Sequence, residues 1–166
     1  MSTPVDTPPV LPFRSAMEAR DLTAATDAFA PDAVCRSPLT DRLAFSGREQ
    51  IRTLMEVVLE VFEGLHYTDE LRVGDRAVLV AEARVAGSEL ELVDHIYLDE
   101  SGKIRELTVF LRPLPATAAA MGAIGASLGK RASTGRARAI SLLTRPLALM
   151  TAAGDPIGVW LVRPTL

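Results

Sequence analysis

The sequence predicts an α+β domain in which two short helices, a short strand and one long helix precede a four-stranded meander. Two patterns lead to this class: apolar residues recur at helical spacing before Gly64, and they alternate with polar residues over 66–112. The composition agrees, because 48% of the residues are hydrophobic and 23% are charged, as in globular proteins. The 166 residues suffice for one domain with an appendage.

Two short helices are expected at the start of the domain. Apolar residues fall at helical spacing within residues 13–20, and Asp21 can cap a second helix that stops before Pro31. A short strand is expected over residues 33–38, ended by Pro38, and a loop follows it.

The clearest helix is expected after Ser46. Ser46 and Glu49 have the spacing of a capping box, in which each side chain satisfies the other residue's free backbone amide. Gly64 is expected to close this helix. Its apolar stripe consists of Ile51, Leu54, Met55, Val58 and Phe62.

The alternating segment is expected to form four antiparallel strands joined by short turns. A two-residue turn at Gly87-Ser88 would place Ala81 opposite Asp94 on the dry face of the sheet. His95 would then lie on the opposite face, where surface or dimer contacts are expected rather than catalysis.

Asp94 carries the chemical prediction, because strand alternation directs its carboxyl group to an apolar side. A carboxylate there either finds a partner, such as Arg14, or has its pKa raised by desolvation. A neutral acid in an apolar cavity can donate a hydrogen bond to a ligand oxygen. A structural acid and a functional acid therefore both remain open at this point. The apolar neighbours on that side are Leu90, Leu92, Ile96 and Leu98.

Charge divides the chain near Pro113 and Pro115. Residues 115–166 carry a net charge of +5, whereas the preceding residues carry −8. We therefore expect a body over residues 1–114 and a basic, Ala/Gly/Leu-rich helical extension over residues 115–166, with helical candidates at 116–129 and 137–153.

The helical extension needs an apolar partner, because its helices would be apolar on nearly all sides. Docking on the acidic body is favoured, over the mouth of a cavity or across a dimer neighbour. The rival interpretation is contact with an anionic membrane surface. Nucleic acid is not expected as a partner, because the chain is acidic and lacks aromatic platforms.

Four short motifs together resemble the NTF2-like superfamily, in its branch of SnoaL-like polyketide cyclases and ketosteroid isomerases. The motifs lie at residues 29–34 (FAPDAV), 45–51 (FSGREQI), 93–96 (VDHI) and 101–104 (SGKI), and the resemblance covers roughly residues 8–114. It implies a cone-shaped, curved antiparallel sheet wrapped around the long helix, with an apolar cavity for a small ligand. It also implies a homodimer joined through the outer face of the sheet.

The resemblance assigns chemical roles to few residues of this chain. Asp94 matches the protonated acid that ketosteroid isomerases use in their oxyanion hole. Ketosteroid isomerase is the standard example of an enzyme with a neutral carboxylic acid at its site. Ser37 stands where their general base would be, and Phe13 where their tyrosine would be. Val109 stands where the related limonene epoxide hydrolases need an aspartate. The usual base and tyrosine are thus missing.

Two functions follow for the expected cavity. One is a cofactor-independent isomerase or lyase, possible through Asp94 as an acid–base residue or as a hydrogen-bond donor to a substrate oxygen. The other is a non-catalytic carrier of a steroid- or polyketide-like molecule. Besides Asp94, the expected pocket residues are Phe13, Met17, Ser37, Met55, Phe62, His66 and Phe110.

Other function classes find no support in the sequence. The spacing of the two histidines and the single cysteine predicts no metal site, and Cys35 is expected to be a buried filler. The glycines at 122, 125 and 129 match no nucleotide-binding motif, so that no cofactor is expected. Without a leader or a spanning segment in the sequence, the cytoplasm is the expected compartment.

Overall fold

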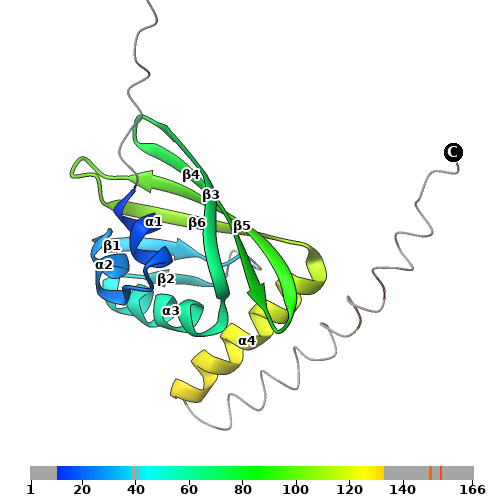
Figure 1. Cartoon of the computed structure of the whole chain (residues 1–166). Coiled ribbons are helices and arrows are strands. Elements are labelled where there is room, and N and C mark those ends of the chain that lie inside the picture. Colours follow the sequence, from blue (N-terminus) through cyan, green and yellow to red (C-terminus); the bar gives the residue numbers. More distant parts are fainter. Residues whose placement is uncertain (1–10, 39, 41, 133–149, 151–153, 155–166) are drawn as a thin grey trace, which may run out of the picture.

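The computed structural model describes residues 11–38, 40, 42–132, 150 and 154, and their elements follow the predicted order with one strand added (Figure 1). That strand, β2, lies where the sequence predicts a loop. The helices are α1 (Pro12–Glu18), α2 (Leu22–Asp27), α3 (Arg48–Val61) and α4 (Leu114–Ala132). The strands are β1 (Phe29–Arg36), β2 (Ala44–Ser46), β3 (Glu63–Val73), β4 (Arg76–Val85), β5 (Ser88–Leu98) and β6 (Ile104–Arg112).

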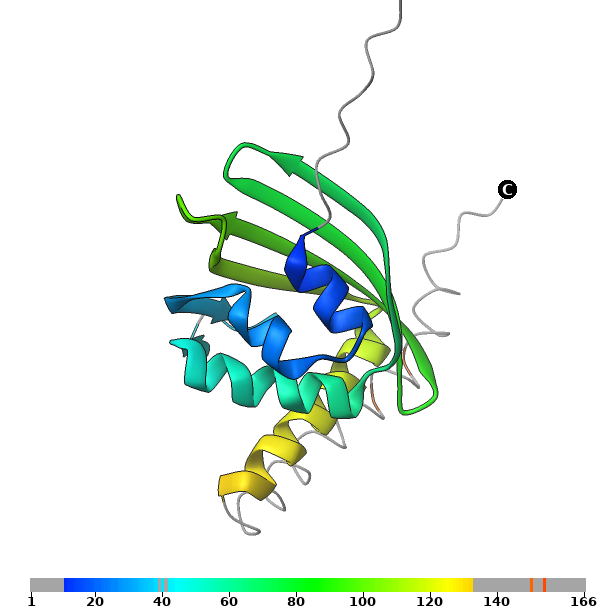
Figure 2. The same ribbon diagram turned by 60° about the vertical axis from the view of Figure 1, so that its left-hand side comes forward.

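The six strands form one sheet in the order β2-β1-β6-β5-β4-β3. The sheet bends around α1, α2 and α3, so that these helices lie on its concave side (Figures 1 and 2). The pairs are antiparallel except for β1 and β6, which run parallel. The predicted curved antiparallel sheet is confirmed, with one parallel pair, because β1 and β6 lie side by side and run in the same direction.

The first strand is longer than its sequence predicts. β1 begins at Phe29 instead of residue 33 and includes Pro31. Its pairing with β6 shifts between Phe29 and Val34, and a proline is tolerated at such an irregularity because it has no N–H to donate. The second helix consequently ends at Asp27, earlier than Pro31 alone would require.

The start of α3 corrects the predicted capping box. Gly47, not Ser46, is the N-cap residue, and its φ of 78° lies in the region that favours glycine. The partner of the Ser46 backbone N–H is therefore the Gln50 side chain at 3.0 Å, not that of Glu49. Most of the apolar stripe is buried as predicted, with Val58 half-buried, but the helix ends at Val61, and Gly64 lies in β3.

The β4–β5 hairpin corrects the predicted register by two residues. Its turn is Ala86-Gly87, both with positive φ, so that Leu79 rather than Ala81 stands opposite Asp94. Positive φ at both central residues is the geometry that suits a two-residue hairpin turn. Because side chains alternate with a period of two, this shift leaves Asp94 on the concave face, where 4% of its surface is exposed.

The helix α4 packs against α3 and against β4, β5 and β6 (Figure 2). Ala116 and Ala120 are buried, and the Arg131 guanidinium lies 2.8 Å from Glu60 and 3.3 Å from Glu56 of α3. The first part of the helical extension is thus docked on the body, as the favoured interpretation expects. Apart from Met150, the second helical candidate lies outside the described residues.

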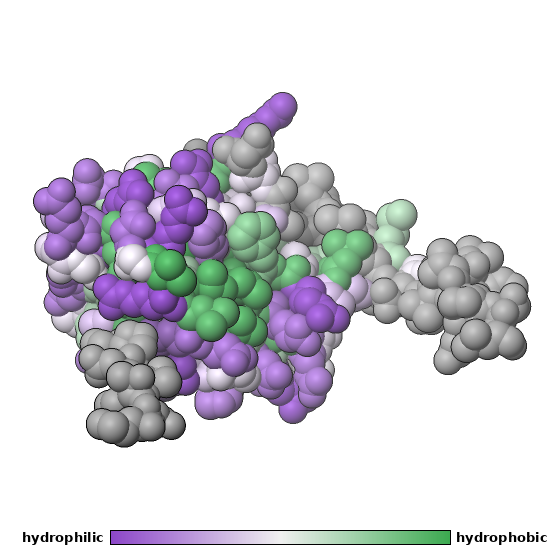
Figure 3. All heavy atoms as spheres, turned by 90° about the horizontal axis from the view of Figure 1, so that it is seen from above, coloured by the Kyte–Doolittle hydropathy of each residue, from purple (hydrophilic) through white to green (hydrophobic). Residues whose placement is uncertain are grey.

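The convex face of the sheet carries apolar side chains that no described element covers. Val93 pairs with Phe110, and 56% of the Phe110 surface is exposed. Apolar residues also gather in one area, bordered by polar ones, in the view from above (Figure 3). The homodimer expected through this face stays a prediction. Within the described ranges, the helices lack the length and hydropathy needed to cross a bilayer.

Candidate functional site

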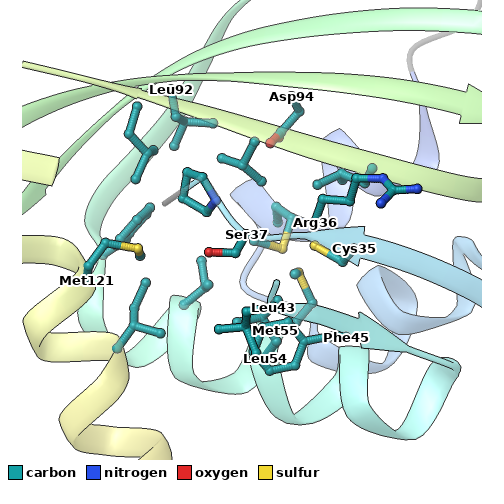
Figure 4. Close-up of a pocket in the computed structure, with 18 of the residues that line it drawn as sticks. Cys35, Arg36, Ser37, Leu43, Phe45, Leu54, Met55, Leu92, Asp94 and Met121 are labelled. Carbon is teal, nitrogen blue, oxygen red and sulfur yellow. The ribbon is translucent and has the colours of Figure 1, made fainter. Parts of the chain in front are cut away.

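A cavity of about 200 Å³ lies between the concave face of the sheet and the helices α1, α3 and α4 (Figure 4). Its wall is almost entirely apolar, and hydroxyl or guanidinium groups are limited to a few positions. The wall consists of Phe13, Met17, Cys35, Arg36, Ser37, Pro38, Thr40, Leu43, Phe45, Leu54, Met55, Val58, Phe62, Leu65, Tyr67, Leu92, Asp94, Leu107, Val109, Leu111, Met121, Ile124, Gly125 and Leu128.

Among the wall residues that the structure describes, Asp94 is the one that carries a carboxyl group. It projects from β5 toward the cavity, whereas the Arg36 guanidinium points away (Figure 4) and lies 2.8 Å from Glu106. Tyr67 donates a hydrogen bond from its hydroxyl group to Asp94 Oδ2 at 3.2 Å. The partner of Asp94 is therefore a tyrosine and not the arginine that the structural interpretation of the sequence suggests.

The environment separates the acidities of these two groups. Burial raises the pKa of Asp94 to about 7, and the hydrogen bond from Tyr67 opposes this effect. Burial and the nearby carboxyl group raise the pKa of Tyr67 well above its usual value. Asp94 therefore changes charge near neutral pH while Tyr67 stays a neutral donor, which is the arrangement that acid–base chemistry needs.

Cys35 also lies on the cavity wall, but its thiol is unreactive. The side chain is 2% exposed, and burial together with the charge of Asp94 raises the pKa of its thiol to about 12. A thiol in this state is a poor nucleophile. The structure thus agrees with the prediction of a buried filler.

The backbone of Tyr67 is held by the polar side of α1. Its N–H donates to Glu18 Oε1 at 2.9 Å, and its carbonyl accepts from Arg14 Nη2 at 2.9 Å. β3 is an edge strand, and its pairing with β4 shifts on both sides of Tyr67. The helix therefore supplies the hydrogen-bond partners that the edge of the sheet leaves open, and it fixes Tyr67 relative to Asp94.

Glu18→Ala is expected to destabilise the protein by about 1 kcal/mol, because the Tyr67 N–H loses its acceptor. It should also move the titration midpoint of Asp94 upward, since a less fixed Tyr67 donates less well to the carboxylate. Glu18→Gln retains an acceptor oxygen and should leave the midpoint in place. Urea unfolding and carboxyl-carbon NMR on the full chain measure both effects. A lower stability with an unmoved midpoint would show that the contact serves the fold alone.

The structure brings together six of the eight residues that the sequence predicts for the site. These six share one cavity. They are Phe13, Met17, Ser37, Met55, Phe62 and Asp94.

His66 and Phe110 are wrongly placed by the sequence prediction. Because adjacent residues of a strand face opposite sides, Tyr67 inside places His66 outside, where its side chain is 70% exposed and lies 3.6 Å from Glu18. Phe110 stands opposite Val93 on the convex face. Leu107, Val109 and Leu111 are the inward residues of β6.

Sequence reasoning missed Tyr67, and it favoured docking of the helical extension on the body without naming the residues of α4 that line the cavity. The face of Tyr67 depends on two register shifts in β3, which no local pattern signals. The inward residues of α4 are Met121, Ile124, Gly125 and Leu128, and their spacing of three, four and seven residues is a helical signal that could have been found. In the described part of the chain, no three His, Cys, Asp or Glu side chains are grouped so that they could hold a metal ion.

Comparison with known proteins identifies the family. A family model, the SnoaL-like domain, matches residues 10–107. The chain belongs to the SnoaL-like family. Among solved structures, this SnoaL-like chain is 30% identical to a steroid delta-isomerase from Pseudomonas aeruginosa, with a TM-score of 0.66 over 72% of this chain and 88% of that one. Among curated proteins, no sequence matches.

Two further structures share the fold of this SnoaL-like chain. An uncharacterized protein with a cystatin-like fold from Silicibacter pomeroyi is 22% identical, with a TM-score of 0.70 over 80% of this chain and 94% of that one. A protein with a ketosteroid isomerase-like fold from Catenulispora acidiphila, in complex with trimethylamine, is 19% identical. Its TM-score is 0.55 over 70% of this chain and 95% of that one.

Proposed function

We propose that this SnoaL-like chain catalyses proton transfer on a small apolar carbonyl compound, with Asp94 as the acid–base residue and Tyr67 as a hydrogen-bond donor. The observation that carries the proposal is a buried carboxyl group on the wall of an apolar cavity, bonded to a tyrosine hydroxyl at 3.2 Å. The likeness to a steroid delta-isomerase supports this reaction class. The apolar wall suits the hydrocarbon part of such a compound.

The proposed reaction is a shift of one proton with no net loss of atoms. Ionised Asp94 takes a proton from the carbon next to the carbonyl group, and the electron pair of that C–H bond moves into an enolate. Once Asp94 carries the proton, the single hydroxyl hydrogen of Tyr67 turns from Asp94 Oδ2 to the enolate oxygen and donates a hydrogen bond to it. Neutral Asp94 then returns the proton. Return to the same carbon restores the starting compound, whereas return to the far end of a neighbouring double bond gives the isomer in which that double bond has moved.

One acid has to serve both steps, because the wall residues described here include no second carboxyl group. The resemblance assigns Asp94 to the role of a neutral donor, but the position of the usual base holds Ser37, which cannot take up a proton from carbon at neutral pH. A pKa of about 7 leaves Asp94 half ionised at that pH, so that it can accept a proton and return it.

Carriage of a small apolar ligand without reaction is the second candidate function. Two positions favour it: Ser37 stands where the resemblance leads one to expect a base, and Phe13 stands where it leads one to expect a tyrosine. In a carrier, neutral Asp94 would donate a hydrogen bond to the ligand oxygen, and this bond would weaken as Asp94 ionises.

An unconjugated β,γ-unsaturated cyclohexenone tests the proposal, because a single proton shift converts it into the conjugated isomer that absorbs in the ultraviolet. The full chain should accelerate this conversion over buffer, with a rate that rises with pH through about 7 as Asp94 ionises. Asp94→Asn should lower the protein-dependent rate by about tenfold or more, since a placed acid–base group contributes at least that much.

Asp32→Asn is the matched control, because Asp32 is an exposed aspartate on β1 and should leave the rate unchanged. Binding of the ketone, followed by ligand NMR, separates the two candidate functions. Binding without acceleration would favour the carrier, and equal rates for the chain and Asp94→Asn would remove Asp94 from the reaction. Neither binding nor acceleration would overturn both candidates for this class of compound.

A further inference from the structure

The helix α4 forms a wall of the cavity that lies outside the family region. The family model ends at residue 107, whereas α4 begins at Leu114. The cavity that Asp94 faces is nevertheless also lined by Met121, Ile124, Gly125 and Leu128 of this helix. In Figure 4, Met121 projects from α4 toward the same space as the Asp94 carboxyl group. Part of the cavity wall is therefore supplied by a segment that the family match does not include.

The contacts of α4 hold this wall close to α3. Ala116 and Ala120 are buried, and small side chains at such positions let a helix approach its neighbours. Arg131, in the last turn, pairs with Glu56 and Glu60 on α3. The helix is thus held along its length by packing and near its end by charge, and Ile124 is only 7% exposed.

The size of the cavity limits what it can hold. With α4 in place the cavity measures about 200 Å³. An engineered apolar cavity of about 150 Å³ binds benzene. A cavity slightly larger than that suits one ring with substituents or two fused rings, and it is too small to enclose a four-ring molecule.

We propose that α4 sets the upper size limit of the ligand, so that this chain accepts compounds of one or two rings and excludes four-ring compounds. Ile124 and Leu128 are the specificity-determining residues, because their side chains occupy space at the cavity wall. Gly125 adds room by having no side chain. The proposal deepens the proposed function, since it names the size class of the compound that Asp94 would meet.

Aromatic hydrocarbons test the size limit separately from the chemistry of Asp94, because they carry no oxygen. Toluene, naphthalene and pyrene contain one, two and four rings. Binding to the full chain is measured by ligand NMR for toluene and by fluorescence for the other two. We expect toluene and naphthalene to bind, and we expect the affinity for pyrene to be at least about tenfold lower than that for naphthalene, as steric limits in apolar pockets produce.

Three variants and one control identify α4 as the cause. Ile124→Ala and Leu128→Ala should enlarge the cavity and reduce the difference in binding affinity between naphthalene and pyrene. Gly125→Ala should weaken naphthalene binding while the helix stays intact, because alanine is the better helix former. Leu114→Ala makes the same change as Leu128→Ala at a residue of α4 that is 66% exposed, and it should change nothing.

Each outcome bears on the proposal in a distinct way. Pyrene binding to the unaltered chain as tightly as naphthalene would overturn the size limit. The role of α4 would be overturned if Ile124→Ala and Leu128→Ala both kept the affinity difference between naphthalene and pyrene while circular dichroism showed that they are folded. The absence of hydrocarbon binding would overturn the accessible cavity itself. Hydrocarbon binding without turnover of the cyclohexenone would contradict the proposed function and leave the size limit standing.

Discussion

Asp94→Asn should stabilise the protein at about pH 8 far more than at about pH 5. Burial raises the pKa of Asp94 to about 7 in the folded chain, whereas an aspartate in an unfolded chain titrates near about 3.9. Between these values the folded state keeps a proton that the unfolded state has released. The free energy of unfolding therefore falls as the pH rises through this range, and it levels off above the folded pKa.

The magnitude follows from the same two pKa values. Each unit of difference corresponds to about 1.4 kcal/mol, so that the full penalty for ionising buried Asp94 is about 4 kcal/mol above pH 7. About 3 kcal/mol of it develops between pH 5 and pH 8. Asparagine does not ionise and can still accept a hydrogen bond from Tyr67. The advantage of Asp94→Asn over the unaltered chain should therefore grow by about 3 kcal/mol over that interval.

Urea unfolding of the two proteins at both pH values measures this difference. Asp32→Asn is again the control, because it removes an exposed carboxyl group from β1 of the same sheet and should follow the unaltered chain. Parallel stability profiles for Asp94→Asn and the unaltered chain would mean that Asp94 ionises as an exposed aspartate does, and the acid–base proposal would lose its basis.

Tyr67→Phe is expected to have the opposite effect on stability at high pH. The change removes the hydroxyl group that donates to Asp94 Oδ2 and leaves the buried carboxylate without this donor. The loss should be about 1–3 kcal/mol at about pH 8, where Asp94 is charged, and smaller at about pH 5, where it is neutral. Because the hydrogen bond lowers the pKa of Asp94, its removal should move the titration midpoint above 7.

Carboxyl-carbon NMR of Asp94 and urea unfolding at both pH values provide the two measurements. Tyr97→Phe is a suitable control, since Tyr97 alternates away from Asp94 on β5 and contacts Arg76 and Arg105 instead. A midpoint that stays at its original value in Tyr67→Phe would show that the hydroxyl group contributes little to the charge state of Asp94.

Local patterns were sufficient to predict most of the elements. The apolar stripe of α3 and the alternation of β5 each depend on residues close in the sequence, and both appear in the structure. The alternation of β5 places Asp94 on the correct face although the predicted hairpin register is wrong by two residues. The error was harmless because a shift of two positions preserves the face of every side chain. A shift of one would have reversed the prediction.

Register and long-range packing account for the errors. Phe110 is predicted to line the cavity, but it pairs with Val93 on the convex face and is 56% exposed. The small strand β2 forms only because β1 offers it a partner, so that its three residues carry no strand pattern of their own. In each of these cases the deciding neighbour is distant in the sequence.

The sequence by itself determined most of the helices and strands and that one carboxyl group faces an apolar interior, since both depend on the period of side chains along one element. Tertiary structure decided what that carboxyl group meets. Tyr67 reaches Asp94 through two register shifts and two contacts from α1, and α4 adds a wall to the cavity while it packs against α3. These arrangements join segments far apart in the chain, and no local pattern of residues specifies them.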